Sequence, residues 1–211
     1  LEKLQAGMDI AQCSDAGMPS ISDPGKELVA AAVQAGIPVI PLPGANAGLT
    51  ALIASGLVPQ PFYFYGFLER KHQQQVTALE ELQNRPETMI FYEAPHRLKK
   101  TLATMAEVFG DDRPAVLARE LTKRYEEFSR GRLGELRDWF DDHQARGEFV
   151  VLVAGNPDPA AAEHDDAQDL SLTEQVDREI VGGLSTNAAI KLVAKRNHFK
   201  RQDLYKQYHN L

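Results

Sequence analysis

Short apolar runs alternate with helix-forming stretches along most of this chain, and that alternation restricts the fold more than any other feature. Each run has the length of a buried strand, and most are followed by a segment with apolar residues at helical spacing. Strands that alternate with helices predict βαβ units around a sheet with parallel strands. The sequence therefore predicts the α/β class.

The alternation begins in residues 1–58, where we expect two strands and two helices. The strands are expected at Met8–Cys13 and Ile37–Leu42, and the helices at Glu27–Gln34 and Asn46–Ala54. Two strands are too few to bury a parallel sheet. We therefore interpret residues 1–58 as the remainder of an N-terminal α/β domain, and expect that earlier strands of this domain are missing.

A second α/β domain with a mixed sheet is expected over residues 59–156, after the proline-rich Val58-Pro59-Gln60-Pro61. Its strands are expected at Phe62–Phe67, Thr88–Glu93, Ala115–Arg119, Glu127–Arg132 and Phe149–Ala154, and its helices at Lys71–Gln83, Arg97–Val108 and Gly134–Gln144. Residues 157–169 are acidic and rich in Pro and Ala, which predicts a flexible linker. Residues 170–211 have the apolar spacing of two or three short helices.

The charge of the chain is unevenly distributed. The formal net charge is −7, which argues against a strongly basic nucleic-acid-binding protein. Residues 185–211 nevertheless carry +5, and the rest of the chain carries −12. Such an asymmetry indicates a polyanionic partner for the basic tail, whose cations are Lys191, Lys195, Arg196, Lys200, Arg201 and Lys206.

The single cysteine, Cys13, excludes an internal disulfide and favours a cytoplasmic location. It lies in an apolar run, so we expect it in the core. No apolar run approaches the roughly 20 residues that a membrane-spanning helix needs. The histidines are scattered along the chain, and no metal-binding spacing stands out.

Four segments at strand ends carry the chemistry. They are Ser14–Gly25, Pro41–Gly48, Phe91–Arg97 and Ala118–Glu127. Open α/β sheets bind ligands where strands end, so these segments are candidates for a site. Each also has a simpler interpretation: a capped turn for the first two, a helix cap at His96 for the third, and a solvated loop for the fourth.

In order, the motifs SDAG-P-ISDPG, PLPGA-A, GFL-RK, FYE-PHR, RELTK--EE and GEFV-LV-G resemble the ribosomal RNA small-subunit methyltransferase I family. That family belongs to the tetrapyrrole-methylase (class III) superfamily. The resemblance runs from about Gly7 to Gly155. The chain departs from the family pattern at Asn46 and Met18, and the family's opening TPIGNL-type motif is absent.

The resemblance implies two α/β domains of the tetrapyrrole-methylase type, a small helical tail, and S-adenosylmethionine held between the two domains. It implies a homodimer, and 2′-O-methylation of a cytidine ribose in the RNA of the small ribosomal subunit. Carried over by position, the cofactor-binding residues are Asp15, Ala16, Gly17, Met18, Asn46, Ala47, Tyr92 and Glu93.

A ribose hydroxyl is a poor nucleophile, so a base that assists proton loss is expected. The candidates are Glu93, Glu120 and His96, with Glu93 first. RNA also needs cations to hold its phosphates. The candidates at strand exits are Arg70, Lys71, Arg97, Arg119, Lys123 and Arg124.

Two other functions remain open. A methylase of the same fold that acts on a tetrapyrrole or another small molecule would have a wide apolar cleft rather than basic walls. Alternatively, Asn187–Ala194 and Arg201–Tyr208 have the spacing of a helix-turn-helix that reads DNA. The RELTK and FYE-PHR motifs favour RNA methylation over the small-molecule methylase. The helix-turn-helix spacing is weak evidence, because any helical hairpin shows it.

Overall fold

We describe the fold from a computed structural model of the chain, covering residues 1–158, 171–197 and 199–209. Its internal contacts divide the chain into two units, Leu1–Pro157 and Asp158–Leu211. Most of the predicted linker, 157–169, lies outside the described residues. None of the described helices is long and apolar enough to cross a membrane.

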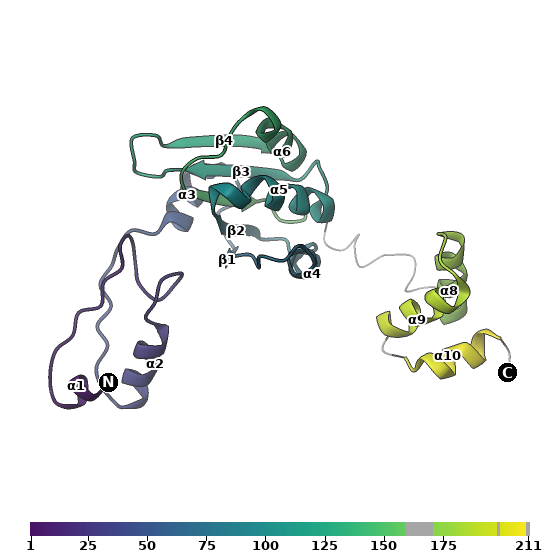
Figure 1. Ribbon diagram of the computed structural model, residues 1–211, viewed down its shortest axis with the longest axis horizontal. Helices are drawn as coiled ribbons and strands as arrows, with labels where there is room; N and C mark the ends of the chain where they lie inside the picture. Colours follow the sequence, from purple (N-terminus) through teal and green to yellow (C-terminus); the bar gives the residue numbers. More distant parts are fainter. Residues whose placement is uncertain (159–170, 198, 210–211) are drawn as a thin grey trace. The chain divides into compact units, whose positions relative to one another are not determined.

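The first unit contains one mixed five-stranded sheet, in the order β1-β2-β5-β3-β4 (Figure 1). β1 is parallel to β2, and β5 is antiparallel to both β2 and β3. The strands are β1 (Phe62–Phe67), β2 (Thr88–Glu93), β3 (Pro114–Arg119), β4 (Glu127–Arg132) and β5 (Phe149–Val153). The predicted mixed sheet is confirmed, and strand ends agree with the prediction to within one residue.

Helices cover both faces of this sheet. One face packs against α4 (His72–Leu82), α5 (Pro95–Phe109) and α6 (Leu133–Asp142), and the other against α3 (Ala47–Ser55). Alternate residues of each strand point to opposite faces. Met89 and Phe91 therefore belong to the larger core, whereas Ile90 and Tyr92 face α3. Tyr92 and Glu93 leave β2 on opposite faces.

The strands predicted at Met8–Cys13 and Ile37–Leu42 are wrong: both segments lack strand structure. A strand needs a neighbour to take up its backbone hydrogen bonds, and neither segment pairs with one. Ile40 and Leu42 are 80% and 81% exposed. Cys13, predicted in the core, is exposed for the same reason. The helices in this part are α1 (Glu2–Gln5) and α2 (Lys26–Gln34).

The second unit packs three short helices around its own apolar core. They are α8 (Leu172–Val181), α9 (Thr186–Arg196) and α10 (Arg201–Tyr208). Val176, Ile190, Val193 and Leu204 are fully buried between them. The predicted helical tail is thus confirmed.

Candidate functional site

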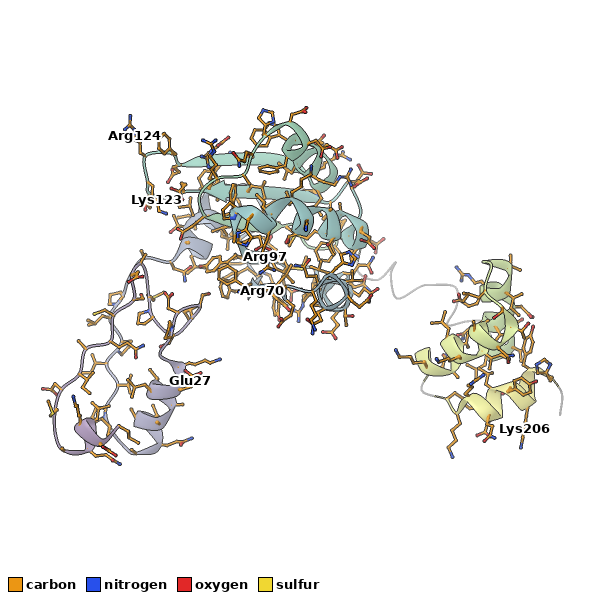
Figure 2. All side chains as sticks on the ribbon, viewed as in Figure 1. Glu27, Arg70, Arg97, Lys123, Arg124 and Lys206 are labelled. Carbon is orange, nitrogen blue, oxygen red and sulfur yellow. The ribbon has the colours of Figure 1, made fainter. Side chains whose placement is uncertain are left out.

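Two of the four segments that the sequence singled out, Phe91–Arg97 and Ala118–Glu127, leave the sheet at the same edge. In the strand register, Phe67 pairs with Tyr92, Phe149 pairs with both Glu93 and Arg119, and Arg119 pairs with Glu127. The ends of β1, β2 and β3 and the starts of β4 and β5 therefore lie at the same edge. Figure 2 labels four cations that follow these strand ends: Arg70, Arg97, Lys123 and Arg124.

The start of α3 is joined directly to the end of β2. The Asn46 side chain caps α3 by accepting a hydrogen bond from the Leu49 N–H at 2.9 Å. The Gly48 N–H donates to the Tyr92 hydroxyl at 3.1 Å. A side chain at Gly48 would approach Ile90 to 3.3 Å, so glycine permits this close docking. Asn46 and Ala47 are thereby held beside Tyr92.

The other end of α3 is fixed by β4. The guanidinium of Arg130 donates to the carbonyl oxygens of Ser55 at 3.1 Å and Ala54 at 2.7 Å. A cation at a helix C-terminus interacts favourably with the carbonyl groups and dipole found there. With both ends anchored on the sheet, α3 presents its first turn to Tyr92 in one orientation.

The loop at residues 14–25 contacts the residues that precede α3. A Cβ at Gly17 would lie 2.9 Å from the Ala45 carbonyl oxygen, and one at Gly44 would lie 3.1 Å from the Met18 side chain. Ser14 Oγ donates to the Gly17 carbonyl at 3.0 Å, which closes the turn that contains Asp15 and Ala16. Contacts thus connect this turn to the start of α3, and the start of α3 to Tyr92.

Burial raises the pKa of Tyr92 above its ordinary value. The hydrogen bond from Gly48 opposes this shift, and the negative charge of Asp23 adds to it. The ring lies edge-on to Phe64 and Phe67, with centroids 5.1 Å and 5.6 Å away. Tyr92 therefore offers an apolar ring and a neutral hydroxyl, with the Asp23 carboxylate in its electrostatic surroundings.

Glu93 is placed as an anchor rather than as a free base. Its side chain is 1% exposed and lies 3.3 Å from the Arg97 guanidinium. One carboxylate oxygen accepts from the Ala94 N–H at 2.8 Å, and the other accepts from Thr101 Oγ1 at 2.6 Å. A carboxylate engaged on both oxygens and hidden from solvent is poorly placed to take a proton from a substrate. The geometry therefore argues against the predicted catalytic role of Glu93.

Glu120 is also engaged. Its carboxylate accepts from the Glu148 N–H at 2.9 Å and from Lys123 Nζ at 3.1 Å. The backbone hydrogen bond, followed by the one from Lys123, lowers its pKa below the ordinary value. A lower pKa makes the carboxylate a weaker base, so the predicted catalytic role of Glu120 is not supported.

His96 is the predicted base whose imidazole remains available. It is exposed at the start of α5, and its ring makes no hydrogen bond to any described residue. It lines a cavity of about 330 Å³ between α5 and α6, together with Lys99, Phe140 and His143. This cavity lies on the sheet face opposite α3, so His96 does not share a face with Tyr92.

The six predicted RNA-binding cations fall into two groups. Arg97, Arg119 and Lys123 are held by carboxylates at 3.3, 2.9 and 2.8 Å, and their charges are neutralised within the protein. Arg97 also donates to the backbone oxygens of Leu68 and Glu69. Arg70, Lys71 and Arg124 are exposed and form no ion pair with any described residue. The second group is the better candidate for phosphate contact.

Comparison with known proteins gives the family. Residues 1–137 match the family model of the tetrapyrrole (corrin/porphyrin) methylases. The ribosomal RNA small subunit methyltransferase I of Bacillus subtilis (strain 168) is 49% identical over 210 residues, which cover 99% of this chain and 72% of that protein. This chain belongs to the ribosomal RNA small subunit methyltransferase I family. That family uses the tetrapyrrole-methylase fold.

Other methyltransferases of the family are equally similar. The protein of the same name from Streptococcus pyogenes serotype M1 is 48% identical, covering 100% of this chain and 72% of its own. The Micromonospora olivasterospora protein is 52% identical over 83% of this chain and 56% of its own. Among solved structures, a cobalt precorrin-4 methyltransferase has a TM-score of 0.49 at 16% identity, covering 65% of this chain and 61% of that one.

The loops of this methyltransferase have the groups that S-adenosylmethionine requires. The cofactor combines a cationic sulfonium, ribose hydroxyls and an adenine ring, and it needs carboxylates, backbone donors and apolar surface. Asp15 and Asp23 supply carboxylates, and the Ala47 N–H at the start of α3 makes no hydrogen bond to a described residue. The Met18 side chain and the Tyr92 ring supply apolar surface. The residues present therefore fit the cofactor in kind.

Three positions that matter to this arrangement escaped sequence reasoning. Gly48 ends the segment Pro41–Gly48, and nothing in the sequence indicates that its N–H links α3 to Tyr92. Thr101 and Arg130 fall inside the predicted helix Arg97–Val108 and the predicted strand Glu127–Arg132. Thr101 lies eight residues after Glu93 and carries a hydroxyl on the buried face of α5, which is a weak signal. Arg130 had none, because its partners are 75 and 76 residues away.

Proposed function

We propose that this chain transfers a methyl group from S-adenosylmethionine to the 2′-oxygen of a cytidine ribose in small-subunit ribosomal RNA. The observation that carries the proposal is the series of contacts from Gly17 and Met18 through Ala45 and Gly48 to Tyr92. It links the loop at residues 14–25 to the start of α3 and to Tyr92 at the end of β2, and it supports a cofactor site there. The names of the relatives at 48–52% identity support RNA as the substrate class.

Alignment is the main contribution expected from the protein. S-adenosylmethionine supplies a methyl group already activated by a cationic sulfur. Asp15, Ala47 and Tyr92 would hold this donor, and the basic edge would hold the RNA. Bringing two reactants into line is worth about 7–11 kcal/mol in intramolecular reactions. The carboxylates of Glu93 and Glu120 are both engaged, and His96 lies on the other face of the sheet from Tyr92. We therefore propose that the hydroxyl proton leaves to solvent.

Cofactor binding is tested by calorimetric titration with S-adenosylhomocysteine. We expect the native chain to bind it, and Tyr92→Phe to bind it about 2- to 10-fold more weakly because the Gly48 N–H loses its acceptor. Tyr65→Phe is the matched control, since Tyr65 packs against Phe91 on the other face. No binding by the native chain would remove the basis of the proposal.

The methylated position is tested with small ribosomal subunits that lack the modification. Labelled S-adenosylmethionine and digestion to nucleosides should give 2′-O-methylcytidine as the labelled product. A label on a base, or transfer to a porphyrinoid and not to RNA, would instead support the small-molecule alternative.

Two further properties are proposed from the family resemblance. We propose that the protein acts as a homodimer and in the cytoplasm, where its substrate is assembled. Sedimentation equilibrium of the purified chain checks the first, and a monomer at all accessible concentrations would contradict it. Fractionation of cells that express a tagged chain checks the second.

A further inference from the structure

Residues 120–126 connect β3 to β4, and two exposed side chains lie at the tip of this connection. We call this pair, Arg124 and Tyr125, the hairpin tip. Tyr125 is 63% exposed, and no other tyrosine of the chain is as exposed. Figure 2 shows Arg124 at the far end of the connection, pointing away from the sheet. Tyr125 is therefore not part of the hydrophobic core, and its ring surface is accessible to a partner.

The backbone beneath the hairpin tip is held in one conformation. Glu120 and Thr122 have φ angles of 47° and 62°, in the left-handed region that side chains other than glycine rarely adopt. Backbone hydrogen bonds run from the Lys123 N–H to Glu120 at 2.9 Å and from the Glu126 N–H to Lys123 at 3.2 Å. The Glu126 carboxylate accepts from the Thr122 N–H at 2.7 Å. The tip is therefore a preorganised feature.

The charges around the tip leave one cation unneutralised. Glu120 and Glu148 share Lys123, Glu126 accepts a backbone hydrogen bond, and Glu127 pairs with Arg119 at 2.9 Å. Arg124 forms no ion pair with any described residue. Its guanidinium carbon lies over the Tyr125 ring, 5.6 Å from the ring centre. The tip thus joins an aromatic surface to a free positive charge.

We propose that the hairpin tip is a stacking site for an unpaired base of the RNA, with Tyr125 as the stacking residue. This inference rests on the proposed function. Proteins recognise RNA mainly through unstacked bases in loops and ends, which stack on aromatic rings and guanidinium planes. A base in a duplex is already stacked on its neighbours and cannot reach the ring. The guanidinium of Arg124 attracts the adjacent phosphate.

Binding of two RNA probes by the full chain tests the stacking role. The probes are a single-stranded oligoribonucleotide and the same sequence closed into a duplex. We expect Tyr125→Ala to lower single-strand affinity about 5- to 100-fold, and Tyr125→Phe to stay within about 2-fold of the native chain. Duplex affinity should not change in either variant. Phe62→Ala removes an exposed ring at the opposite sheet edge and should leave both affinities unchanged.

A fluorescent variant gives an independent readout. In Tyr125→Trp, a stacked base should quench the emission of the new indole when single-stranded RNA is added. The native chain, with Trp139 as its one tryptophan, supplies the reference signal. No additional quenching at saturating RNA would overturn the stacking site, even if the RNA binds.

The remaining outcomes distinguish failure of the stacking site from failure of the proposed function. Unchanged single-strand affinity in Tyr125→Ala, with the native chain binding and methylating RNA, would refute the stacking site and leave the proposed function in place. Equal losses for both probes, matched by Arg124→Gln, would make the tip a phosphate contact. A native chain that binds neither RNA nor S-adenosylhomocysteine would end both proposals. Retained S-adenosylhomocysteine binding shows that a variant is folded.

Discussion

The carboxylate of Glu93 leaves water almost completely on folding, and three groups replace its lost hydration. The Ala94 N–H, the Thr101 hydroxyl and the Arg97 guanidinium all come from the first turns of α5 or the residue before them. Glu93 thus ties the end of β2 to the start of α5. Because Tyr92 is the preceding residue, this tie also fixes the ring that meets α3.

Thr101→Val tests that anchor without changing the shape of the side chain. The buried carboxylate oxygen loses its donor, so we expect the free energy of unfolding to fall by about 1–3 kcal/mol. Urea unfolding of the chain measures it. Thr77→Val is the matched control, because the exposed Thr77 hydroxyl bonds only to the Gln73 carbonyl; its effect should stay within about 0.5 kcal/mol. Equal small effects of the two substitutions would show that Glu93 does not depend on Thr101.

At the scale of elements, the β3–β4 connection should respond to acid. The pKa of Glu120 is lowered, first by the hydrogen bond from the Glu148 N–H and then by Lys123. A lowered pKa means that the folded state favours the carboxylate, so its stabilising contribution is complete above the unfolded value of about 4.3. It is lost as the pH falls through the lower folded value.

Amide exchange of Glu148 follows this loss. We expect protection of its N–H to be constant down to about pH 5 and to decrease below that, relative to amides of the same sheet. Glu120→Gln keeps an acceptor but removes the titration, and should flatten the profile. A native profile already flat between pH 5 and pH 2 would contradict the assignment of Glu120 as the titrating group.

Serines stand at the N-cap positions of α8 and α9, but only the serine before α8 caps its helix through its side chain. Ser171 caps α8 by a reciprocal arrangement with Glu174, whose N–H bonds to Ser171 Oγ and whose carboxylate bonds to the Ser171 N–H at 2.7 Å. Ser185 stands at the same position of α9 without a side-chain cap. Ser171→Ala should lower the opening free energy of α8 by about 0.5–2 kcal/mol, and Ser185→Ala should change α9 little. Hydrogen exchange of each helix measures it, and equal effects would contradict the capping assignment.

The elements that the sequence predicted correctly are those whose signals are local. Strands β1 to β5 and helices α3 to α6 each contain apolar residues at the spacing of their own structure and are bounded by turn residues. Their bounds therefore agree with the prediction to within about two residues. The segments Met8–Cys13 and Ile37–Leu42 have the same local pattern but no neighbouring strand, and pairing is not encoded in the run itself. Likewise, motif position placed Asn46 beside Tyr92, whereas the roles of Glu93 and Glu120 depend on partners that position does not reveal.

At the scale of the whole molecule, the question is how a chain of net charge −7 binds a polyanion. Part of the answer is that many of the negative charges are paired within the protein. Carboxylates form ion pairs with Arg97, Arg119 and Lys123. Arg70 and Lys71 form no ion pair with a described residue and are exposed to a ligand. The tail adds exposed lysines at 191, 195, 200 and 206. Local cations, rather than the net charge, should therefore set the affinity for RNA.

The salt dependence of the RNA affinity measures how many phosphate contacts these cations make. Each phosphate contact on a single strand contributes about 0.7 to the slope of log affinity against log salt. Arg70→Gln with Lys71→Gln should therefore reduce the slope by about 1.4, and neutralising Lys191, Lys195 and Lys206 together should reduce it by about 2. Lys100→Gln removes an exposed lysine of α5 that has no described ion-pair partner, and should leave the slope unchanged. If the tail variant keeps the native slope, the tail lysines contribute to solubility and the sheet edge alone holds the RNA.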